Sequence, residues 1–296
     1  MNPDALADGP AIDGSESRAL WEERLQGTVD ESSVGCAGFG RQYNRWLYRL
    51  RAHVFRRTVK ALGLEVDRCR VLDVGSGTGF YLDQWSRLGA RHLEGLDFTE
   101  AAVGHLRSRF PDLRFHRADI SEWAGDGGEG PFDIVSAFDV LFHIVDDAKY
   151  QAALDGIARL LRPGGTLLFS DNFAHHERPK SSPYHYSRTL TEIQRRVEAA
   201  GLELHSRRPM FVLMNAPDDS TSPLLRGWWR LLTAFAQRGE RAGWLAGAAL
   251  YPIDRALTYL LHEGPTTELA VCRRPPQPGG RAEAKARSGG GPPEEP

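Results

Sequence analysis

The sequence of 296 residues contains only three cysteines, Cys36, Cys69 and Cys272, and none of them forms a C-x-x-C pair. Small secreted domains that depend on disulfides carry cysteines in larger, even numbers. We therefore expect three free thiols and a protein of a reducing compartment, without a disulfide framework.

The sequence also lacks an excess of either charge and any long apolar run. It has 37 basic and 39 acidic side chains, a formal net charge of −2, so no basic surplus favours general binding to nucleic acid. The longest uncharged stretch near the C-terminus, 242–253, is shorter than the roughly 20 residues of a membrane-spanning helix. The first residues lack a basic region followed by an apolar one, so we expect no signal peptide and a cytoplasmic protein.

Two terminal stretches contain few bulky apolar residues. Residues 1–17 have acidic side chains but no basic one, and residues 275–296 are dominated by proline, glycine and charge. Such segments bury too little apolar surface to offset the conformational entropy lost on ordering. Both are predicted to be disordered tails, and residues 18–274 are predicted to form one domain.

Within that domain, short apolar runs alternate with amphipathic stretches. Strands are predicted at 70–74, 93–96, 113–117, 132–138, 166–170, within 202–214 and at 268–273. Helices are predicted between them, and a cap segment at 39–62, helical from about residue 44, precedes the first strand. This pattern predicts an α/β fold: a doubly wound, Rossmann-like, seven-stranded sheet with a helical insertion, 216–263, before the last strand.

A glycine-rich turn, D-V-G-S-G-T-G from Asp73 to Gly79, directly follows the first predicted strand. In a doubly wound fold, ligands bind at the carboxyl ends of the strands, and glycine allows a ligand to approach the backbone closely. A nicotinamide dinucleotide site requires a small third residue in G-x-G-x-x-G, and counted from Gly75 that position is Phe80. The turn therefore argues against a nicotinamide site.

The same turn, D-x-G-x-G-x-G, resembles motif I of the class I S-adenosylmethionine-dependent methyltransferases, of the small-molecule type. Further segments resemble this family in the correct order: the end of the second strand (LEGLDFT), the end of the third (FHRADI), the fourth strand (FDIVSAFDVLFHI) and the Pro-Gly-Gly turn with the fifth strand (LLRPGGTLLFSDNF). The close resemblance covers roughly residues 65–175.

The resemblance implies S-adenosylmethionine as the cofactor and a role for each matching residue. Gly75 and Gly77 would line its methionine and ribose part, and Asp73 would organise this loop. By the same resemblance, Asp97 would bind the ribose hydroxyls. Phe98, Asp119 and Ile120 would contact the adenine, and the backbone near Phe138 would contact the amino group.

A hydroxyl acceptor needs a base to remove its proton, and imidazole suits this role because its ordinary pKa is near 6.5. The candidates follow the fourth and fifth strands: His143 with Asp139, and His175 and His176 with Asp171. The polar stretch 184–186 is a further candidate for closing over the acceptor. No metal site is expected, because His175 and His176 alone cannot complete a zinc shell.

Two motifs that the sequence lacks limit the classes of molecule that can be the methyl acceptor. Relatives that methylate exocyclic amines of nucleobases or glutamine carry Asn/Asp-Pro-Pro-Tyr/Phe after the fourth strand, whereas residues 137–141 read AFDVL, and the Pro-Cys signature of cytosine-C5 enzymes is missing too. We therefore expect a small-molecule acceptor rather than nucleic acid, methylated at oxygen. The sequence leaves three alternatives: methylation at nitrogen or carbon, a cofactor-binding subunit without catalysis, and, third, a nicotinamide oxidoreductase. It does not indicate the oligomeric state.

The insertion 216–263 is rich in tryptophan, leucine and arginine. One interpretation is a helical cap that packs its own core against the sheet edge. The other is that the insertion walls an apolar substrate pocket or lies on a membrane surface, and so presents a lipid-linked or bulky natural-product acceptor. The N-terminal segment with Phe39, Tyr43 and Trp46 is predicted to cover the cofactor from the other side.

Overall fold

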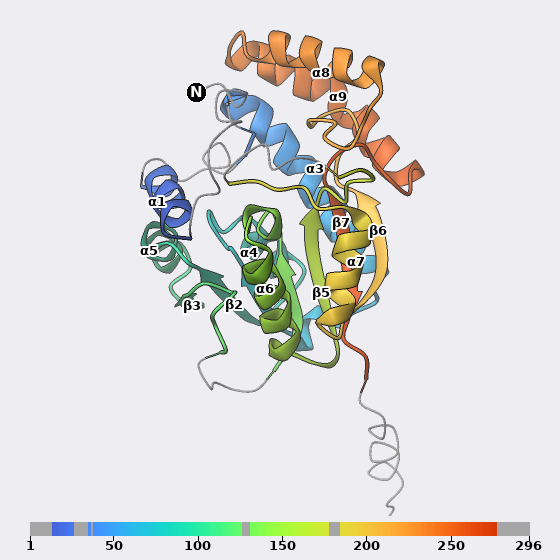
Figure 1. Cartoon of the computed structure of the whole chain (residues 1–296). Coiled ribbons are helices and arrows are strands. Elements are labelled where there is room, and N and C mark those ends of the chain that lie inside the picture. Colours follow the sequence, from blue (N-terminus) through green and yellow to red (C-terminus); the bar gives the residue numbers. More distant parts are fainter. Residues whose placement is uncertain (1–13, 27–34, 37, 126–130, 178–183, 277–296) are drawn as a thin grey trace, which may run out of the picture.

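A computed structural model describes residues 14–26, 35–36, 38–125, 131–177 and 184–276 (Figure 1). Its centre is a seven-stranded sheet in the order β3-β2-β1-β4-β5-β7-β6. The first five strands run parallel, and β7 is antiparallel to both β5 and β6. This is the predicted Rossmann-like architecture, built from β1 Arg70–Val74, β2 His92–Asp97, β3 Arg114–Arg117, β4 Phe132–Ala137, β5 Leu161–Asp171, β6 Glu203–Pro209 and β7 Glu268–Arg273.

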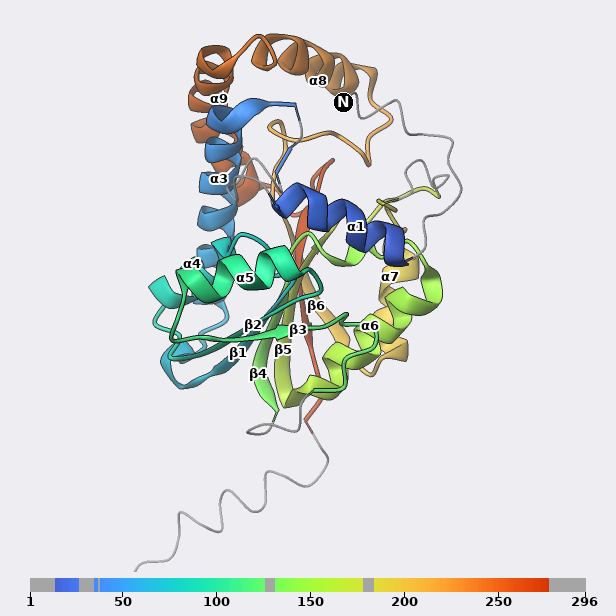
Figure 2. The same cartoon turned by 90° about the vertical axis from the view of Figure 1, so that its left-hand side faces the viewer.

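Helices cover both faces of the sheet (Figure 2). Residues of neighbouring positions in a strand point to opposite faces, so Val71 of β1 enters one hydrophobic core and Leu72 enters the other. The first core is shared with α3 Gly40–Ala61, α4 Phe80–Arg87 and α5 Glu100–Arg109, and the second with α6 Asp147–Leu160 and α7 Leu190–Ala199.

Side-chain caps fix where several helices begin. Thr99, Asp146 and Thr189 each accept a hydrogen bond from a backbone N–H in the first turn of α5, α6 and α7, respectively. The Thr189 cap belongs to a T-x-x-E sequence, in which the glutamate would normally reach back to the cap. Here Glu192 instead forms an ion pair with Arg196 one turn further on.

The observed strands agree with the predicted ones to within a few residues, except at β5. This strand was predicted to start after the Pro-Gly-Gly turn, but it begins at Leu161, because Leu161 already pairs with Phe132 of β4. The ladder between β4 and β5 shifts register just beyond that pair, so the strand accommodates the turn as an irregularity. Helix α3 begins at Gly40, four residues before its predicted start.

The predicted helical insertion is a pair of helices, α8 Pro223–Ala236 and α9 Glu240–Leu260, between β6 and β7. Helix α9 lies along α3 (Figure 1). Two glycines of α9 make this close approach possible: a Cβ added at Gly247 would stand 2.3 Å from the Trp46 ring, and one at Gly243 would stand 3.3 Å from the Phe39 carbonyl oxygen. None of the described helices has both the length and the apolar character needed to cross a membrane.

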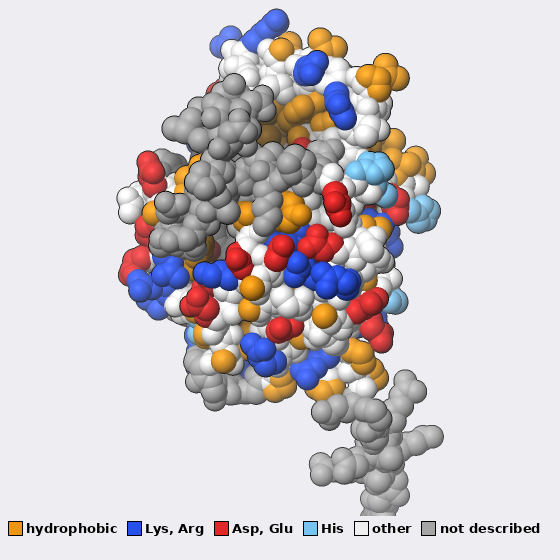
Figure 3. All heavy atoms as spheres, in the orientation of Figure 1, with side chains coloured by type: hydrophobic (Ala, Val, Ile, Leu, Met, Phe, Trp, Pro, Cys, Tyr) orange, Lys and Arg blue, Asp and Glu red, His pale blue; other side chains and the backbone are white. Residues whose placement is uncertain are grey.

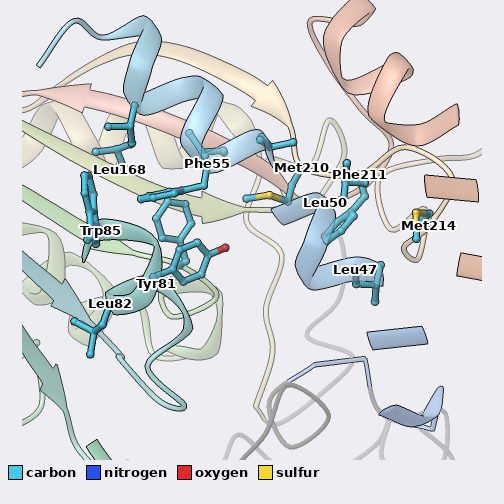
Figure 4. Packing of buried hydrophobic residues seen from close by; sticks show 14 of the residues in the cluster. Leu47, Leu50, Phe55, Tyr81, Leu82, Trp85, Leu168, Met210, Phe211 and Met214 are labelled. Carbon is cyan, nitrogen blue, oxygen red and sulfur yellow. The ribbon is translucent and has the colours of Figure 1, made fainter. Parts of the chain in front are cut away.

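Helix α3 packs between the sheet domain and the insertion. The Phe55 ring lies 4.8 Å from the Trp85 ring and 5.4 Å from the Tyr81 ring, both on α4. Figure 4 shows these rings together and, further along α3, Leu50 near Phe211 of the segment that follows β6. The buried surface of α3 is therefore part of one continuous core that reaches from β1 to the insertion.

Helix α1, Gly14–Leu25, was not among the predicted elements. The prediction of a disordered tail over 1–17 is wrong for residues 14–17, which form its first turn. Glu22 explains part of its placement: its carboxylate accepts hydrogen bonds from the backbone N–H groups of Glu100 (2.9 Å) and Ala101 (2.8 Å), which open α5. Residues 1–13 and 277–296 lie outside the described residues, where the tails remain a prediction.

Candidate active site

A pocket of about 1340 Å³, including its mouth, opens at the carboxyl ends of β1, β2 and β4. This is the edge at which open α/β sheets bind ligands. Its walls come from the glycine-rich turn, from α1, α3 and α4, and from the loops that follow the strands. Most of the residues assigned to the cofactor line this pocket: Gly75, Gly77, Asp97, Phe98, Asp119, Ile120 and Phe138.

The glycine-rich turn forms the floor of the pocket. Gly75 and Gly77 have φ angles of 66° and 48°, in the left-handed region that favours glycine. A Cβ at Gly75 would lie 2.3 Å from a methyl group of Val140, so no side chain fits there. The turn is tied to β2 by a 2.7 Å hydrogen bond from the Gly75 N–H to the Leu96 carbonyl oxygen. Bare backbone is thereby held against the pocket.

Asp97 ends β2 and is buried with its carboxylate at the pocket. Its Oδ1 accepts hydrogen bonds from the Thr99 N–H (2.9 Å) and hydroxyl (2.7 Å), and its Oδ2 accepts one from the Gly77 N–H (3.0 Å). Burial raises the pKa of the Asp97 carboxyl, and these three hydrogen bonds oppose that rise. Oδ2 keeps a lone pair that can accept from a hydroxyl group in the pocket.

A second carboxylate lies further along the pocket, after β3. Asp119 Oδ1 accepts hydrogen bonds from the Ser121 N–H (2.9 Å) and hydroxyl (2.7 Å), which fix its direction. The Phe98 ring and the buried Ile120 supply apolar surface in the same pocket. The Arg18 guanidinium of α1 lies 5.8 Å from the centre of the Phe98 ring.

Asp73 does not line the pocket. Its Oδ1 accepts a hydrogen bond from the Ser136 hydroxyl (2.6 Å), which in turn accepts one from Trp85 Nε1 (2.9 Å). Burial raises the pKa of the Asp73 carboxyl to about 7, against the opposing effect of the serine hydrogen bonds. Its link to the turn is its backbone carbonyl oxygen, which accepts from the Ser76 hydroxyl (2.8 Å).

Asp139, which follows β4, lines the pocket with a φ of 57°, a conformation that aspartate adopts more readily than most residues. Its carboxylate is paired with the Arg51 guanidinium of α3, which is largely buried, and it also accepts a hydrogen bond from the Ser170 hydroxyl (2.9 Å). Because both interactions engage its lone pairs, Asp139 is better suited to orienting its neighbours than to removing a proton.

His143 also lines the pocket, on the loop after β4. Its Nδ1 is 2.6 Å from the Tyr184 carbonyl oxygen. Because a carbonyl can only accept, Nδ1 must carry the hydrogen, and the neutral ring then presents Nε2 as a proton acceptor. Burial lowers the pKa of His143, so the ring is neutral at pH 7. The Trp21 ring of α1 packs edge-on against it, with centroids 4.9 Å apart.

His175 and His176 do not reach this pocket, which corrects their selection as candidate bases on the acceptor side. Just after β5, Phe173 has a φ of 43°, and Ala174 forms an isolated bridge with Thr189. His175 then pairs with Asp219, whose carboxylate raises its pKa first by hydrogen bonding and second by its charge. His176 is exposed on the same segment.

The pocket is covered by a different helix from the one predicted. Phe39, Tyr43 and Trp46 face other segments: Phe39 stacks on Trp229 of α8, Trp46 contacts Trp244 of α9, and the Tyr43 hydroxyl donates to the Met214 carbonyl oxygen, just before the insertion. The cover is α1, whose pocket-lining residues are Ser17, Trp21 and Leu25. Their i, i+4, i+8 spacing is a helical signal that was present in the sequence. From α3, Tyr48 reaches the pocket instead.

Residues 71–165, which contain the glycine-rich turn, Asp97 and His143, match a family model described as a methyltransferase domain. The chain therefore contains a methyltransferase domain of the class I S-adenosylmethionine-dependent type. S-adenosylmethionine is the cofactor of this family.

A ubiquinone biosynthesis O-methyltransferase of Aromatoleum aromaticum is 38% identical over 105 residues, 34% of this chain and 43% of that protein. A probable S-adenosylmethionine-dependent methyltransferase of Mycolicibacterium smegmatis is 31% identical over 147 residues, 48% of this chain and 54% of that protein.

The chain spans about half of the length of these curated relatives. Among solved structures, a magnesium protoporphyrin IX methyltransferase from Synechocystis PCC 6803 with bound S-adenosylmethionine superposes with a TM-score of 0.53 at 15% identity. The superposition covers 90% of this chain and 100% of the Synechocystis chain. An N-methyltransferase from Bradyrhizobium japonicum WM9 with bound S-adenosylhomocysteine gives 0.50 at 15% identity, over 88% and 98% of the two chains. These likenesses show the fold.

The pocket of this methyltransferase fits the cofactor of its family chemically. A carboxylate with a free lone pair, Asp97, suits a ribose diol, and the bare backbone of the glycine turn leaves room for a ligand. Phe98 and Ile120 provide apolar surface for a flat base, with the Asp119 carboxylate in the same part of the pocket for an exocyclic amine.

Proposed function

We propose that this chain transfers the methyl group of S-adenosylmethionine to a hydroxyl group of a small molecule, with His143 as the base. The observation that carries the proposal is the hydrogen bond from His143 Nδ1 to the Tyr184 carbonyl oxygen, which leaves Nε2 as a proton acceptor in a pocket that also holds the family's cofactor residues. The relatives named as ubiquinone biosynthesis O-methyltransferases support oxygen as the methylated atom.

The roles of the protein groups follow from their positions. Asp97 and the Gly75–Gly77 backbone hold the cofactor, which when bound supplies a methyl group already activated by its positive sulfur. His143 Nε2 takes the hydroxyl proton as the acceptor oxygen bonds to the methyl carbon and the carbon–sulfur bond breaks. The Arg51–Asp139 pair and the Phe138 ring, stacked on Tyr81 at 4.1 Å, fix the wall on the acceptor side. Helix α1, through Trp21, excludes water from this side of the pocket.

The alternatives make different predictions about turnover. Methylation at nitrogen or carbon of a natural-product or lipid-linked acceptor would use the same cofactor site, but an amine needs no base of this kind. A cofactor-binding partner subunit would bind without turnover. A nicotinamide oxidoreductase would bind a dinucleotide, which Phe80 at the third position of the glycine motif disfavours.

The first test is titration calorimetry of the full chain with S-adenosylhomocysteine. We expect binding to the unaltered protein and an affinity loss on the order of 10- to 100-fold for Asp97→Ala, because a hydrogen bond to a charged group contributes about 1.5–3 kcal/mol. Asp112→Ala, which removes an exposed carboxylate between α5 and β3, is the matched control and should bind normally. Thermal unfolding checks that both variants are folded.

Two results would contradict the cofactor assignment: absence of binding to the unaltered protein, or equal binding by Asp97→Ala and Asp112→Ala. Incubation with methyl-labelled cofactor and an extract of the source organism then tests turnover and reports the acceptor. Label in a compound from which mild O-demethylation removes it supports the hydroxyl acceptor. Label that resists such treatment indicates nitrogen or carbon, and binding without any label transfer indicates a partner subunit.

A further inference from the structure

The exposed large apolar side chains of this protein are concentrated in one place. Among the described residues there are nine, and all nine lie between Leu224 and Leu261. The most exposed are Leu224 (84%), Tyr259 (71%), Leu231 (70%) and Leu260 (68%). Figure 3 shows orange side chains over the α8–α9 end of the molecule, with blue basic groups among them. Single exposed apolar residues are ordinary on a protein surface, but a contiguous cluster marks an interaction site.

The outer face of helix α9 is mostly apolar, unlike that of an ordinary surface helix. Its exposed residues are eight apolar ones, two arginines and Glu240 at its first turn. A helix that ends in solvent normally exposes polar and charged side chains on its outer face. On α8, Leu224, Leu231 and Phe235 form a second exposed apolar stripe, because spacings of 7 and 11 residues place them on one side of the helix. We call this surface the α8–α9 face and define it by Leu224, Leu231, Trp244, Leu245, Ile253 and Leu260.

The exposed charged residues between 223 and 260 are five arginines and one acid, Glu240. Arg226, Arg230, Arg238, Arg241 and Arg255 are exposed there, and none of them forms an ion pair with a described residue. Elsewhere in the described chain many arginines are paired, as Arg196 is with Glu192. Arg226 donates a hydrogen bond to the Ser220 carbonyl oxygen (3.1 Å) and Arg238 lies 6.0 Å from the centre of the Phe235 ring, but no described carboxylate forms an ion pair with any of the five arginines.

The two acidic residues of these helices are already engaged. The Glu240 carboxylate accepts hydrogen bonds from the Arg41 N–H (2.9 Å) and the Gln42 N–H (2.7 Å) at the start of α3. Asp254 is buried, and it accepts from backbone N–H groups of the segment after β6. A second copy docked symmetrically through the same face would bring arginine toward arginine without counter-charges, at a high desolvation cost. The negative charge is better supplied by a partner of a different kind.

We propose that the α8–α9 face binds the surface of a membrane that contains anionic lipids. Leucine, tryptophan and tyrosine side chains enter the interfacial region of a bilayer, and arginines beside them contact acidic headgroups. The helices lie on the surface and do not cross it, in keeping with the absence of a spanning helix among the described residues. This inference is independent of the proposed function, because it requires neither the cofactor nor an acceptor.

The test is flotation of the full chain with vesicles. One set of vesicles is an equimolar mixture of phosphatidylglycerol and phosphatidylcholine, and the other is phosphatidylcholine alone. We expect the protein to float with the anionic vesicles at 50 mM salt, and to bind at least tenfold less to the neutral vesicles or to anionic ones at 500 mM salt, because salt screens exposed charges.

Two pairs of substitutions separate the apolar and the charged parts. Leu245→Ser with Ile253→Ser removes exposed apolar surface without a change of charge, and Arg230→Glu with Arg241→Glu reverses two charges. Each pair is expected to lower the partition coefficient at least tenfold. The matched control is Arg91→Glu with Arg114→Glu, which makes the same change of net charge at exposed positions of β3 and the turn before β2. It should float like the unaltered protein, and thermal unfolding checks that every variant is folded.

Several outcomes would overturn the proposal. Protein that stays at the bottom of the gradient with every vesicle would show that the face does not bind lipid. Equal losses in the control pair and in the Arg230/Arg241 pair would show a response to net charge alone. A dimer, seen by sedimentation without vesicles and abolished by the Leu245/Ile253 pair, would identify a second copy as the occupant of the face.

Discussion

At the scale of single residues, the protonation state of His143 is set by its surroundings in two ways. The Tyr184 carbonyl oxygen selects the tautomer with a free Nε2, and burial lowers the pKa of the ring below 6.5. A base acts only in its neutral form, so activity should be full above the pKa of His143 and fall as pH drops through it. The acidic limb of the pH–rate profile is therefore expected below pH 6.5.

Replacement of His143 tests this directly. We expect His143→Gln to lower kcat roughly 10²- to 10⁴-fold, the usual contribution of a positioned base, with little change in cofactor affinity and with loss of the acidic limb. His92→Gln, at an exposed histidine at the start of β2, is the control and should keep both rate and profile. An unchanged acidic limb in His143→Gln would assign the proton transfer to another group. The measurement is label transfer to the identified acceptor between pH 5 and pH 8.

At the scale of elements, α1 owes its position over the pocket to a small number of contacts. The Glu22 carboxylate joins it to the first turn of α5, and Trp21 contacts the pocket next to His143. Loss of the Glu22 contacts should release α1 while leaving the sheet intact. We expect Glu22→Ala to weaken S-adenosylhomocysteine binding about three- to tenfold, with faster hydrogen exchange in residues 14–26. Its neighbour Glu23 is exposed, so Glu23→Ala should change neither quantity; equal effects of the two substitutions would refute this role of α1.

The packing of α9 on α3 gives a second prediction at this scale. A Cβ at Gly247 would stand 2.3 Å from the Trp46 ring, whereas a Cβ at Gly227, in the interior of α8, would meet nothing within 4 Å. Gly247→Ala is expected to destabilise the protein by about 1–3 kcal/mol through overpacking. Gly227→Ala should be neutral or stabilising by up to about 1 kcal/mol, because alanine favours the helix. Urea unfolding measures both, and equal free energies of unfolding would contradict the packing.

The elements that the sequence predicted well are those with a strong local signal. The strand predicted at 70–74 matches β1, because apolar patterns act over a few residues, and the caps at Thr99 and Thr189 are local signals of the same kind. The antiparallel direction of β7 and the covering of the pocket depend on contacts between distant segments. Thus the Glu22 contacts to α5, and the Tyr184 carbonyl that orients His143 across 41 residues, have no signal in local pattern. His175 and His176 were selected by their place after β5, but neither lines the pocket, and His175 pairs with Asp219, 44 residues further along the chain.

At the scale of the whole molecule, the pocket and the α8–α9 face are connected through α3. Tyr48 of this helix lines the pocket, and Trp46, on the same helix, contacts Trp244 (6.2 Å between ring centroids) and Tyr251 (5.4 Å) of α9. The insertion thus shares a rigid support with the site. If the α8–α9 face binds a membrane surface as we propose, α3 is the element that links that surface to the pocket.

The shared core also bears on our proposal that residues 18–274 form one domain. Leu232 of α8 and Leu250 of α9 are buried in the same cluster as Val71 of β1 and Trp85 of α4. Because no separate core isolates the insertion, we expect the insertion and the sheet to unfold together in a single transition, with coincident melting by far-UV circular dichroism and tryptophan fluorescence. Leu250→Ala should lower that one midpoint, with a loss of about 2–5 kcal/mol, rather than split it.

Ligand binding sharpens this last test, because the cofactor pocket lies in the sheet region and the insertion does not line it. S-adenosylhomocysteine at 100 times its dissociation constant should stabilise the folded state by about 2.7 kcal/mol. If the chain is one cooperative unit, the fluorescence and circular dichroism transitions shift upward together, including the signal from the tryptophans of α8 and α9. A calorimetric transition that the ligand does not shift would instead show that the insertion unfolds by itself. Residues 216–263 would then have to be counted as a separate folding unit.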